Sequence, residues 1–565
     1  MVFGFSITKL RFNGGDEVPL QPGSMLILVG PNNGGKSTAL RDMQQSLAAP
    51  ASNRVVLDSV ETAAEGSADD FDQWVRTHFP LKSPGPGNPL QFATRGAWVP
   101  EEQVKGSWEN GSFRQTMASF LVNLLGTEDR LTLTKWGPSA NLVTHPPERY
   151  IHVMQANDTL DRSVRAQIKA AFGQDLLIHR GAGQQVGFHV GAEPPTGGGV
   201  DRVSESYLTA LNQLPKLDDQ GDGLRSYVGS ILAAFCGSQP ILLIDEPEAF
   251  LHPPQARRLA TALASTAVSA GRQIVVATHS ADVVEGAVVS GVSVTVCRVT
   301  RDGAENHARK LDPADLKQLW ANPLLRSAAA IDGMFHDGVV ICESDADCRL
   351  YEAMVRRIES SGRLTRVPDL FFTHGGGKGA LAALASAYGA LDVDRRVIAD
   401  LDLLRNVTEL RRTAEGLGMD WPSIERPATS AVRNLVDIAP LLTDKQFRER
   451  LAQLLRDADQ NKTDIRRDVA KVAADAADWS DVKRYGISKL RSKPLQEAED
   501  FLRTLRSGGL FLVPVGELEG WYPGGSTDKP KWFIEAMVEL DRVPDSLPAL
   551  EQFVLTLLAS FGYLD

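Results

Sequence analysis

The sequence predicts an α/β protein of two domains, and three observations support this prediction. At 565 residues the chain is longer than one ordinary hydrophobic core accommodates. A glycine-rich loop, Gly30–Thr38, follows an apolar strand and precedes a helix near the amino end. A second series of short apolar strands begins near Val339, and several of them end in acidic residues. We place the boundary around 325–337 and expect domains at about 1–330 and 331–565.

The composition is that of an ordinary soluble protein, with 43% hydrophobic and 23% charged residues. A net charge of −11 argues against a surface coated in positive charge, although a local basic groove or a bound metal would still attract nucleic acid. The four cysteines form no CxxC pair, which argues against a disulfide framework and against structural zinc. No window holds the roughly 18 apolar residues of a membrane span, so we expect a cytoplasmic protein without membrane contact.

The elements of the first domain follow from periodicity and turn residues. Strands are expected in FGFSITKLRF and in SMLILVG, and a helix from about Ser37. A mixed region at about 90–200 differs from a standard nucleotide-binding segment; we predict that it is an insertion and a candidate for dimerisation. From Gly221 to about Ser290 helices and strands alternate, as α/β units do.

The loop GPNNGGKST satisfies the pattern G-x-x-x-x-G-K-[ST]. Backbone amides of such a loop hold phosphates, helped by the positive end of the following helix. Lys36 is expected to reach the β- and γ-phosphates and Ser37 to ligate Mg²⁺, so we predict ATP as a cofactor. The residues expected to contact the nucleotide are Gly30, Asn33, Gly34, Gly35, Lys36, Ser37 and Thr38.

A second nucleotide motif lies in PILLIDEPEAFLHP, where a buried strand ends in Asp245 and Glu246. Two carboxylates at the end of a buried strand would be poorly satisfied without a function. We expect Asp245 to hold Mg²⁺ through water and Glu246 to polarise the attacking water. His279 ends VVATHS and is predicted to sense the γ-phosphate; a satisfied histidine at a strand end is the alternative.

Carboxylates also end the predicted strands of the second domain. Glu343 ends GVVICE, Asp400 and Asp402 end RRVIADLD, and a glycine-rich turn with Lys378 lies between them. Such carboxylates would repel one another unless cations bridge them, and oxygen ligands favour Mg²⁺ or Mn²⁺ over zinc. Two such ions about 3.5–4 Å apart support phosphodiester cleavage. A fourth piece, GLFLVPVGELEGW, ends a strand with Glu517 and Glu519. Each acidic piece alone is commonly a solvated cap, but the four pieces together predict a metal site.

The first domain resembles an ATP-binding-cassette (ABC) ATPase of the SMC and OLD type. In that family a signature segment upstream of the Asp-Glu strand contacts nucleotide held by another subunit. The stretch GDGLRSYVGSILAAF occupies this place with Asp222 and Gly223 at its tip, although the commoner tip is Ser-Gly-Gly. The resemblance implies a head-to-head homodimer or a higher oligomer. Gln155 is a candidate for the Q-loop glutamine.

The order of Glu343, the Lys378 turn and Asp400-x-Asp402 resembles a Toprim domain, a Rossmann-like fold, here with a helical insertion at about 407–507. Following an ABC ATPase, it resembles the OLD (overcoming lysogenization defect) family of nucleases, which includes the nuclease subunit of the Gabija antiphage system. The resemblance implies metal ligation by Glu343, Asp347, Asp400, Asp402, Glu517 and Glu519, with Glu343, Asp400 and Asp402 acting in catalysis. It also implies a late lysine near the scissile phosphate, Lys529 or Lys531, of which we select Lys531.

The sequence therefore predicts an ATP-binding, metal-dependent DNA endonuclease in antiphage defence, with an accessory defence protein as a candidate partner. Two alternatives stay open. One is an SMC-like ATPase whose Toprim domain binds nucleic acid or a partner without cutting; the other is an enzyme acting on another phosphate ester such as RNA. A basic stretch, DVKRYGISKLRSKP, is a candidate for phosphate contacts, and a solvated helix face is an equal alternative.

Overall fold

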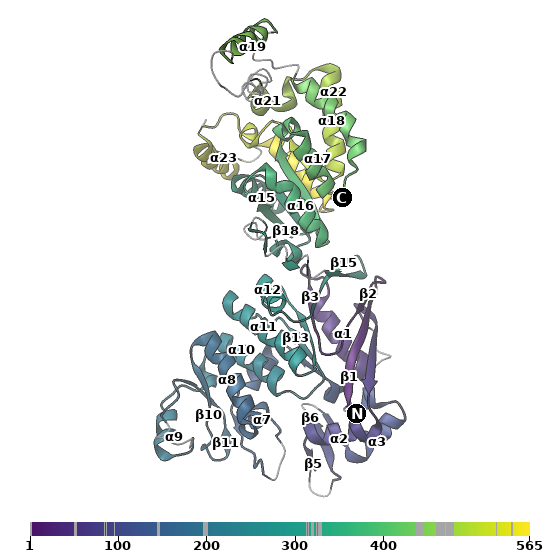
Figure 1. Ribbon diagram of the computed structural model, residues 1–565, viewed down its shortest axis with the longest axis vertical. Coiled ribbons are helices and arrows are strands. Elements are labelled where there is room, and N and C mark those ends of the chain that lie inside the picture. The colour runs from purple at the N-terminus through teal and green to yellow at the C-terminus, as the bar shows by residue number, and fades with distance from the viewer. Residues whose placement is uncertain are drawn as a thin grey trace. The chain divides into compact units, whose positions relative to one another are not determined.

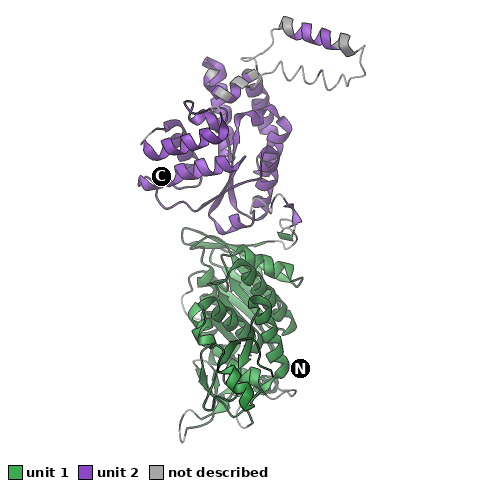
Figure 2. Ribbon diagram, turned by 90° about the vertical axis from the view of Figure 1, so that its left-hand side faces the viewer, with its two compact units in different colours: residues 1–318 green, residues 319–565 purple. Residues whose placement is uncertain are grey.

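Figure 1 shows the chain as a computed structural model. The structure describes residues 3–49, 54–83, 85, 88–94, 97–143, 147–195, 202–311, 314, 316–317, 321–323, 325, 330–436, 444–458, 469, 480–526, 528–543 and 546–564. The chain divides into two compact units, Met1–Gln318 and Leu319–Asp565, coloured separately in Figure 2. The division therefore lies before the stretch 325–337 in which we expected the boundary.

A six-stranded sheet in the order β16-β15-β3-β14-β13-β8 forms the centre of unit 1. Its strands are β3 (Met25–Val29), β8 (Val122–Leu125), β13 (Ile241–Asp245), β14 (Gln273–Ala277), β15 (Val294–Asp302) and β16 (Glu305–Leu311). β15 and β16 pair antiparallel, and the other pairings are parallel. β3 and β14 are buried along their whole length, as expected for apolar strands covered on both faces. The carboxyl ends of β3, β13 and β14 therefore share one edge.

The region 90–200 is not wholly an insertion, because it contains β8. This strand pairs in parallel with β13 and forms an edge of the central sheet. Only four residues, VNLL, make up the strand, so its apolar run is too short to stand out in the sequence. Its partner β13 lies far along the chain, and nothing local indicates the pairing.

The other elements of unit 1 surround this sheet (Figure 1). An antiparallel sheet contains β1 (Gly4–Phe12), β2 (Glu17–Pro19) and β4 (Leu57–Glu65). Small sheets contain β5 (Leu81–Lys82), β6 (Gln91–Thr94) and β7 (Ala97–Pro100); β9 (Gly137–Pro138) and β11 (Gln185–Val186); and β10 (Asp175–Ile178) and β12 (Phe188–Gly191). The helices are α1 (Lys36–Ala48), α2 (Ala68–His78), α3 (Glu101–Glu109), α4 (Phe113–Thr116), α5 (Ala118–Leu121), α6 (Thr127–Leu133), α7 (Tyr150–Ala156), α8 (Asp158–Phe172), α9 (Glu205–Leu211), η1 (Leu217–Asp219), α10 (Asp222–Cys236), α11 (Pro253–Ser269) and α12 (Ala281–Val289).

Unit 2 is built on a parallel four-stranded sheet in the order β18-β17-β19-β20. Its strands are β17 (Gly338–Cys342), β18 (Leu370–His374), β19 (Asp394–Asp400) and β20 (Leu510–Val513). The α-helices are α15 (Asp345–Ser360), α16 (Leu381–Ala390), α17 (Val407–Gly416), α18 (Trp421–Val436), α19 (Asp444–Ala458), α21 (Ser480–Tyr485), α22 (Ser492–Ser507), α23 (Lys529–Arg542) and α24 (Pro548–Ser560). The short 3₁₀ turns are η2 (Asp332–Phe335), η3 (Lys378–Ala380), η4 (Leu401–Arg405), η5 (Gly486–Lys489) and η6 (Leu518–Trp521).

The order of strands in unit 2 determines which acidic residues can meet. β17 lies beside β19, and β19 lies beside β20, so three strands that precede carboxylates are neighbours. In a parallel sheet their carboxyl ends point to the same edge, where α/β proteins bind ligands. Among the residues that the structure describes between β19 and β20, the α-helices are α17, α18, α19, α21 and α22. Across the described ranges of both units, no helix combines the length and the apolar character of a membrane span.

Candidate functional site

The phosphate loop of unit 1 is packed tightly against β15 and β16. Gly30 has a φ of 135°, and a Cβ there would lie 2.1 Å from the carbonyl oxygen of Val299. Gly35 has a φ of 99°, and a Cβ would lie 2.8 Å from Nδ2 of Asn306. That same Nδ2 donates to the carbonyl oxygen of Gly34 at 2.9 Å. The glycines are therefore required by close approach as well as by φ, and Asn306 is a support that the motif itself does not reveal.

Lys36 and Ser37 join this loop to the Asp-Glu strand. Lys36 Nζ donates to the carbonyl oxygens of Gly30 and Pro31, each at 2.8 Å. Burial lowers the pKa of Lys36 to about 8, against the opposing effect of the neighbouring carboxylates. Ser37 Oγ donates to Asp245 Oδ1 at 2.8 Å. The two side chains predicted to ligate Mg²⁺, far apart in the sequence, are thus in direct contact.

Arg130 holds the turn that carries the Asp-Glu pair, and sequence reasoning missed it. Its fully buried guanidinium, on α6, donates to the carbonyl oxygens of Asp245 at 2.6 Å and Glu246 at 2.9 Å. Glu246 has a φ of 46°, a left-handed conformation that glycine adopts more readily. Arg130 Nε donates to Ser226 Oγ at 3.0 Å, so α10 supports the same guanidinium. Nothing in the local sequence of α6 indicates this role.

His279 lies close to Glu246, with 3.7 Å between Nε2 and Oε1. A second carboxylate, Glu248, positions the histidine by accepting from its backbone N at 2.8 Å and from Thr278 Oγ1 at 2.7 Å. Burial raises the pKa of Glu248. Sequence reasoning missed Glu248, although its place in DEPE directly after the strand was a usable signal. The structure therefore brings together Lys36, Ser37, Asp245, Glu246 and His279.

The signature segment lies apart from this group. Asp222 begins α10 and pairs with Arg225 of the same helix at 3.0 Å. A Cβ on Gly223 would lie 2.6 Å from the carbonyl oxygen of Phe250. Within the described ranges no hydrogen bond or ion pair joins Asp222 or Gly223 to the phosphate loop of the same chain. Gln155 lies inside α7, where its Oε1 is buried without a hydrogen-bond partner, and Arg130 is the residue that reaches the Asp-Glu turn instead.

In unit 2 the carboxylates of Glu343, Asp400 and Asp402 converge. One oxygen from each lies within 4.8 Å of the others. Glu343 Oε1 also accepts from the backbone N of Asp400 at 2.9 Å, which ties the ends of β17 and β19 together. Burial raises the pKa of Asp400 to about 8, and the nearby charges of Glu343 and Asp347 add to the shift. Burial raises the pKa of Glu343 too. Burial and mutual proximity therefore both disfavour the charged forms of Glu343 and Asp400.

Asp347 lines a cavity together with Glu343 and Asp400, but its carboxylate also caps a helix. Its Oδ2 accepts from Ser344 N at 3.0 Å and from Ser344 Oγ at 2.6 Å, which forms a capping box at the start of α15. Ser344 is thus the cap of this helix. Among the described groups, the three-carboxylate cluster does not include Asp347. Asp345, between them in sequence, forms an exposed ion pair with Arg349 at 2.8 Å.

The late acidic residues meet Lys529, not Lys531. Lys529 Nζ lies 2.8 Å from Glu519 Oε1 and 3.4 Å from Glu517 Oε2. Lys531 instead faces Glu535 of its own helix at 4.0 Å. Our choice of Lys531 is therefore not supported by its position, because two residues along α23 turn the side chain away from the carboxylates. Glu519 Oε2 is buried and has no hydrogen-bond partner.

Two lysines contact Asp402. Lys378, in the glycine-rich turn, forms an ion pair with its Oδ1, and Lys483 lies 3.0 Å from its Oδ2. Lys483 belongs to the basic stretch that we considered for phosphate contacts, but its ammonium group forms an ion pair with Asp402 of the same unit. In the same stretch Lys493 lies 3.6 Å from Glu497. The side chains of Arg484 and Lys489 lie outside the described residues.

A cavity of about 420 Å³ opens over the carboxylates. Glu343, Asp347, Asp400, Glu519 and Lys529 line it. His374, at the end of β18, lines it as well, and its Nδ1 is buried without a hydrogen-bond partner. Sequence reasoning quoted this histidine only as part of a strand. The cavity offers hard oxygen donors together with a lysine, a combination suited to a phosphate ester beside a divalent cation.

Comparisons with known proteins bear on the first of these sites. Residues 201–285, which contain α10, the Asp-Glu strand and His279, match the family described as "AAA domain, putative AbiEii toxin, Type IV TA system". The Old nuclease of Escherichia phage P2 is 26% identical over 176 residues, which are 30% of this chain and 29% of that protein. The resemblance to the OLD family is thereby confirmed. The match thus spans less than a third of this OLD relative.

Among solved structures, SMC head domains are similar to this OLD-like chain. An Smc head bound to the carboxy-terminal winged-helix domain of ScpA is 14% identical, with 54% of this chain and 98% of that chain covered and a TM-score of 0.32. The SMC head from Thermotoga maritima is 12% identical, with 55% and 100% covered and a TM-score of 0.29. These scores carry no argument of their own. The family match places an ATPase domain in unit 1 and supports ATP as a ligand.

Proposed function

We propose that the chain is an ATP-binding, Mg²⁺- or Mn²⁺-dependent DNA endonuclease of OLD type, with a Toprim domain in unit 2. The observation that carries the proposal is the convergence of Glu343, Asp400 and Asp402 at the carboxyl edge of a parallel sheet. The donor set consists of hard oxygens, and the raised pKa of Asp400 reflects its burial first and the neighbouring carboxylates of Glu343 and Asp347 second. A divalent cation fits both facts.

Glu343, Asp400 and Asp402 would hold the metal, and Asp347 and Glu519 line the same cavity. When bound, such a metal supplies Lewis-acid stabilisation of the phosphate and lowers the pKa of bound water. The chain's own lysines hold the rest of the site in place. Lys378 and Lys483 orient Asp402, and Lys529 presents its ammonium group to the cavity, where it would contact a substrate phosphate.

In unit 1, Lys36, Ser37 and Asp245 would hold ATP and its Mg²⁺, with Glu246 as general base and His279 beside it. The segment at Asp222 and Gly223 would contact ATP of a second subunit in a head-to-head homodimer or higher oligomer. We propose further that the protein acts on DNA in the cytoplasm, in antiphage defence, with or without an accessory defence protein.

One observation favours the alternative of a Toprim domain that binds without cutting. Lys378 and Lys483 between them contact both carboxylate oxygens of Asp402. Internal ammonium groups can balance an acidic cluster without a metal, as ion pairs do elsewhere. Cleavage and metal binding therefore have to be measured separately.

Cleavage is tested with supercoiled plasmid, Mg²⁺ or Mn²⁺, and the full-length chain, with and without ATP. We expect nicked or linear product from the wild type and a loss of more than about 100-fold in Asp400→Ala, because a ligand is removed. Glu415→Gln is the matched control, since this exposed carboxylate pairs with Arg411 on α17 and neither belongs to the three-carboxylate cluster nor lines the cavity. If Asp400→Ala cuts as fast as the wild type, the site is wrongly assigned.

Metal binding is tested by thermal unfolding in a Mn²⁺ titration. A cation that relieves repulsion in the folded state raises the unfolding temperature of the wild type. Glu343→Gln should lose this shift, and Glu415→Gln should keep it. A shift that persists unchanged in Glu343→Gln contradicts the metal site, whereas no shift in any variant together with no cleavage favours the non-cutting alternative.

A further inference from the structure

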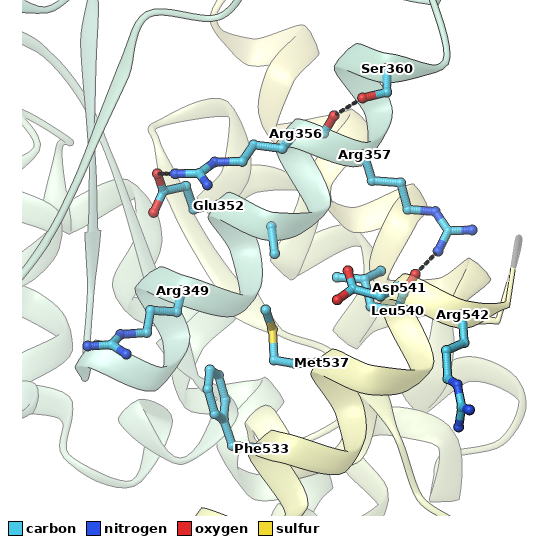
Figure 3. A pocket seen from close by; sticks show the side chains of 11 residues that line it. Arg349, Glu352, Arg356, Arg357, Ser360, Phe533, Met537, Leu540, Asp541 and Arg542 are labelled. Carbon is cyan, nitrogen blue, oxygen red and sulfur yellow. Dashed lines mark hydrogen bonds and ion pairs between the residues drawn. The ribbon is translucent and has the colours of Figure 1, made fainter.

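A groove of about 810 Å³ runs between α15 and α23 of unit 2 (Figure 3). Four arginines line it: Arg349, Arg356, Arg357 and Arg542. The acidic residues along the same groove are Glu352 and Asp541, so the lining carries more positive than negative charge. Phe533, Met537 and Leu540 provide apolar surface between the two helices. The groove therefore combines cations with an aromatic and aliphatic surface.

This groove adjoins the carboxylate cavity. Phe533 lines both of them. α15 begins two residues after Glu343, and α23 begins with Lys529, so both helices start at the acidic site. In Figure 3, Arg349 and Phe533 lie at one end of the groove, and Arg357 and Arg542 lie toward the other. A ligand that occupied both would pass from the carboxylates along the arginines.

The arginines differ in how firmly they are engaged. Arg357 donates to the backbone carbonyl oxygens of Leu540 and Val543, so it ties α15 to the end of α23. Arg349 and Arg356 form ion pairs one turn away on α15, with Asp345 at 2.8 Å and Glu352 at 2.6 Å. Both pairs are exposed to solvent, and exposed ion pairs between neighbouring turns of a helix contribute little to stability. A phosphate group can therefore displace the carboxylates at small cost.

We propose that this groove binds a single-stranded segment of the DNA whose phosphodiester lies at the carboxylates, an inference that rests on the proposed function. Arg349, Arg356 and Arg542 contact backbone phosphates, and a base packs on Phe533. Carboxylates alone would repel a polyanion, so a substrate needs cations beside them. Cations next to an aromatic side chain suit an unpaired strand, whose bases have exposed faces that a duplex hides.

The experiment measures binding without cleavage. Full-length protein in EDTA is titrated into a fluorescently labelled 20-nucleotide single strand and into the duplex of the same sequence, at several salt concentrations. The groove variant is Arg349→Ala/Arg356→Ala/Arg542→Ala. The matched control is Arg411→Ala/Arg412→Ala/Arg503→Ala, which removes three exposed helical arginines that are also paired with nearby acids on their own helices.

The groove variant should bind the single strand about tenfold or more weakly, with a salt slope smaller by about 2, since each phosphate contact contributes about 0.7. The control should bind as the wild type does. Wild-type affinity in the groove variant, an equal loss for duplex and single strand, or no single-strand binding by the wild type would each overturn the inference.

Phe533→Leu gives a second measurement, because leucine keeps the packing but removes the ring. An oligonucleotide with 2-aminopurine should show less stacking-dependent quenching on this variant; unchanged quenching would contradict the proposed base contact. Plasmid cleavage by the groove variant is followed in parallel with Mn²⁺. Normal cleavage with normal binding defeats this inference alone, whereas absent wild-type cleavage with the expected binding loss defeats the nuclease proposal alone.

Discussion

At the scale of single residues, Arg130 holds the backbone of the Asp-Glu turn in the ATPase site. A buried arginine that donates to two successive carbonyl oxygens stabilises a turn in which Glu246 has a left-handed backbone. Burial lowers the pKa of Arg130, and the carboxylates of Glu248, Asp245 and Glu246 oppose that shift. The neighbouring carboxylates therefore help to keep the guanidinium of Arg130 protonated in its buried position.

Arg130→Met should lower the stability of the folded chain by about 2–3 kcal/mol, because buried carbonyl oxygens lose a charged donor. ATP hydrolysis should fall at least about tenfold, since Glu246 is no longer held in place. Both are measured on purified protein, by thermal unfolding and by phosphate release. The exposed Arg162→Met on α8 is the control, and wild-type hydrolysis by Arg130→Met would refute the role given to Arg130.

At the scale of elements, the segment after β20 positions a lysine on the carboxylate cluster. Gly516 has a φ of 107°, and a Cβ there would lie 2.0 Å from the carbonyl oxygen of Lys483. Gly516 also accepts from the backbone N of Leu401 at 2.8 Å. α21 and η4 therefore pack on this segment by direct backbone approach, which brings Lys483 to Asp402.

Gly516→Ala should strain this contact twice, through the left-handed φ, which costs about 1–3 kcal/mol, and through the overlap with a backbone atom. We expect a lower unfolding temperature and a smaller Mn²⁺-dependent shift. Gly524→Ala is the control, since a Cβ there has no heavy atom within 4 Å among the residues the structure describes. Equal stability of the two alanine variants would show that the close packing around Gly516 is not required.

At the scale of the whole molecule, ATP is expected to join two copies of the chain. Glu246→Gln should bind ATP without hydrolysing it, so the ATP-bound form accumulates. Light scattering should then give twice the mass of one chain with ATP, and Lys36→Ala should show no such change because its phosphate contact is lost. An unchanged mass of Glu246→Gln with ATP would argue against the head-to-head dimer.

Site residues could be predicted from the sequence where the residues that form the site lie close together in the chain or follow parallel strands. The phosphate loop could be predicted because it consists of nine consecutive residues. The glycines within it indicate backbone conformations that other residues rarely adopt. The carboxylates could be predicted because residues that follow parallel strands share an edge. The choice between Lys529 and Lys531 could not be made from the sequence. The two side chains differ by about 200° around a helix, and which of them faces the carboxylates depends on how α23 is docked.

By itself, then, the sequence determined the chemistry: a phosphate loop, an Asp-Glu strand and oxygen donors at strand ends. Tertiary structure alone decided which residues support that chemistry. Arg130 reaches Glu246, Lys483 reaches Asp402, and β8 joins the central sheet only because elements far apart in the chain pack together. Such contacts form where the surfaces of whole elements are complementary. Short motifs and periodicity in the sequence do not indicate which of these surfaces pack together.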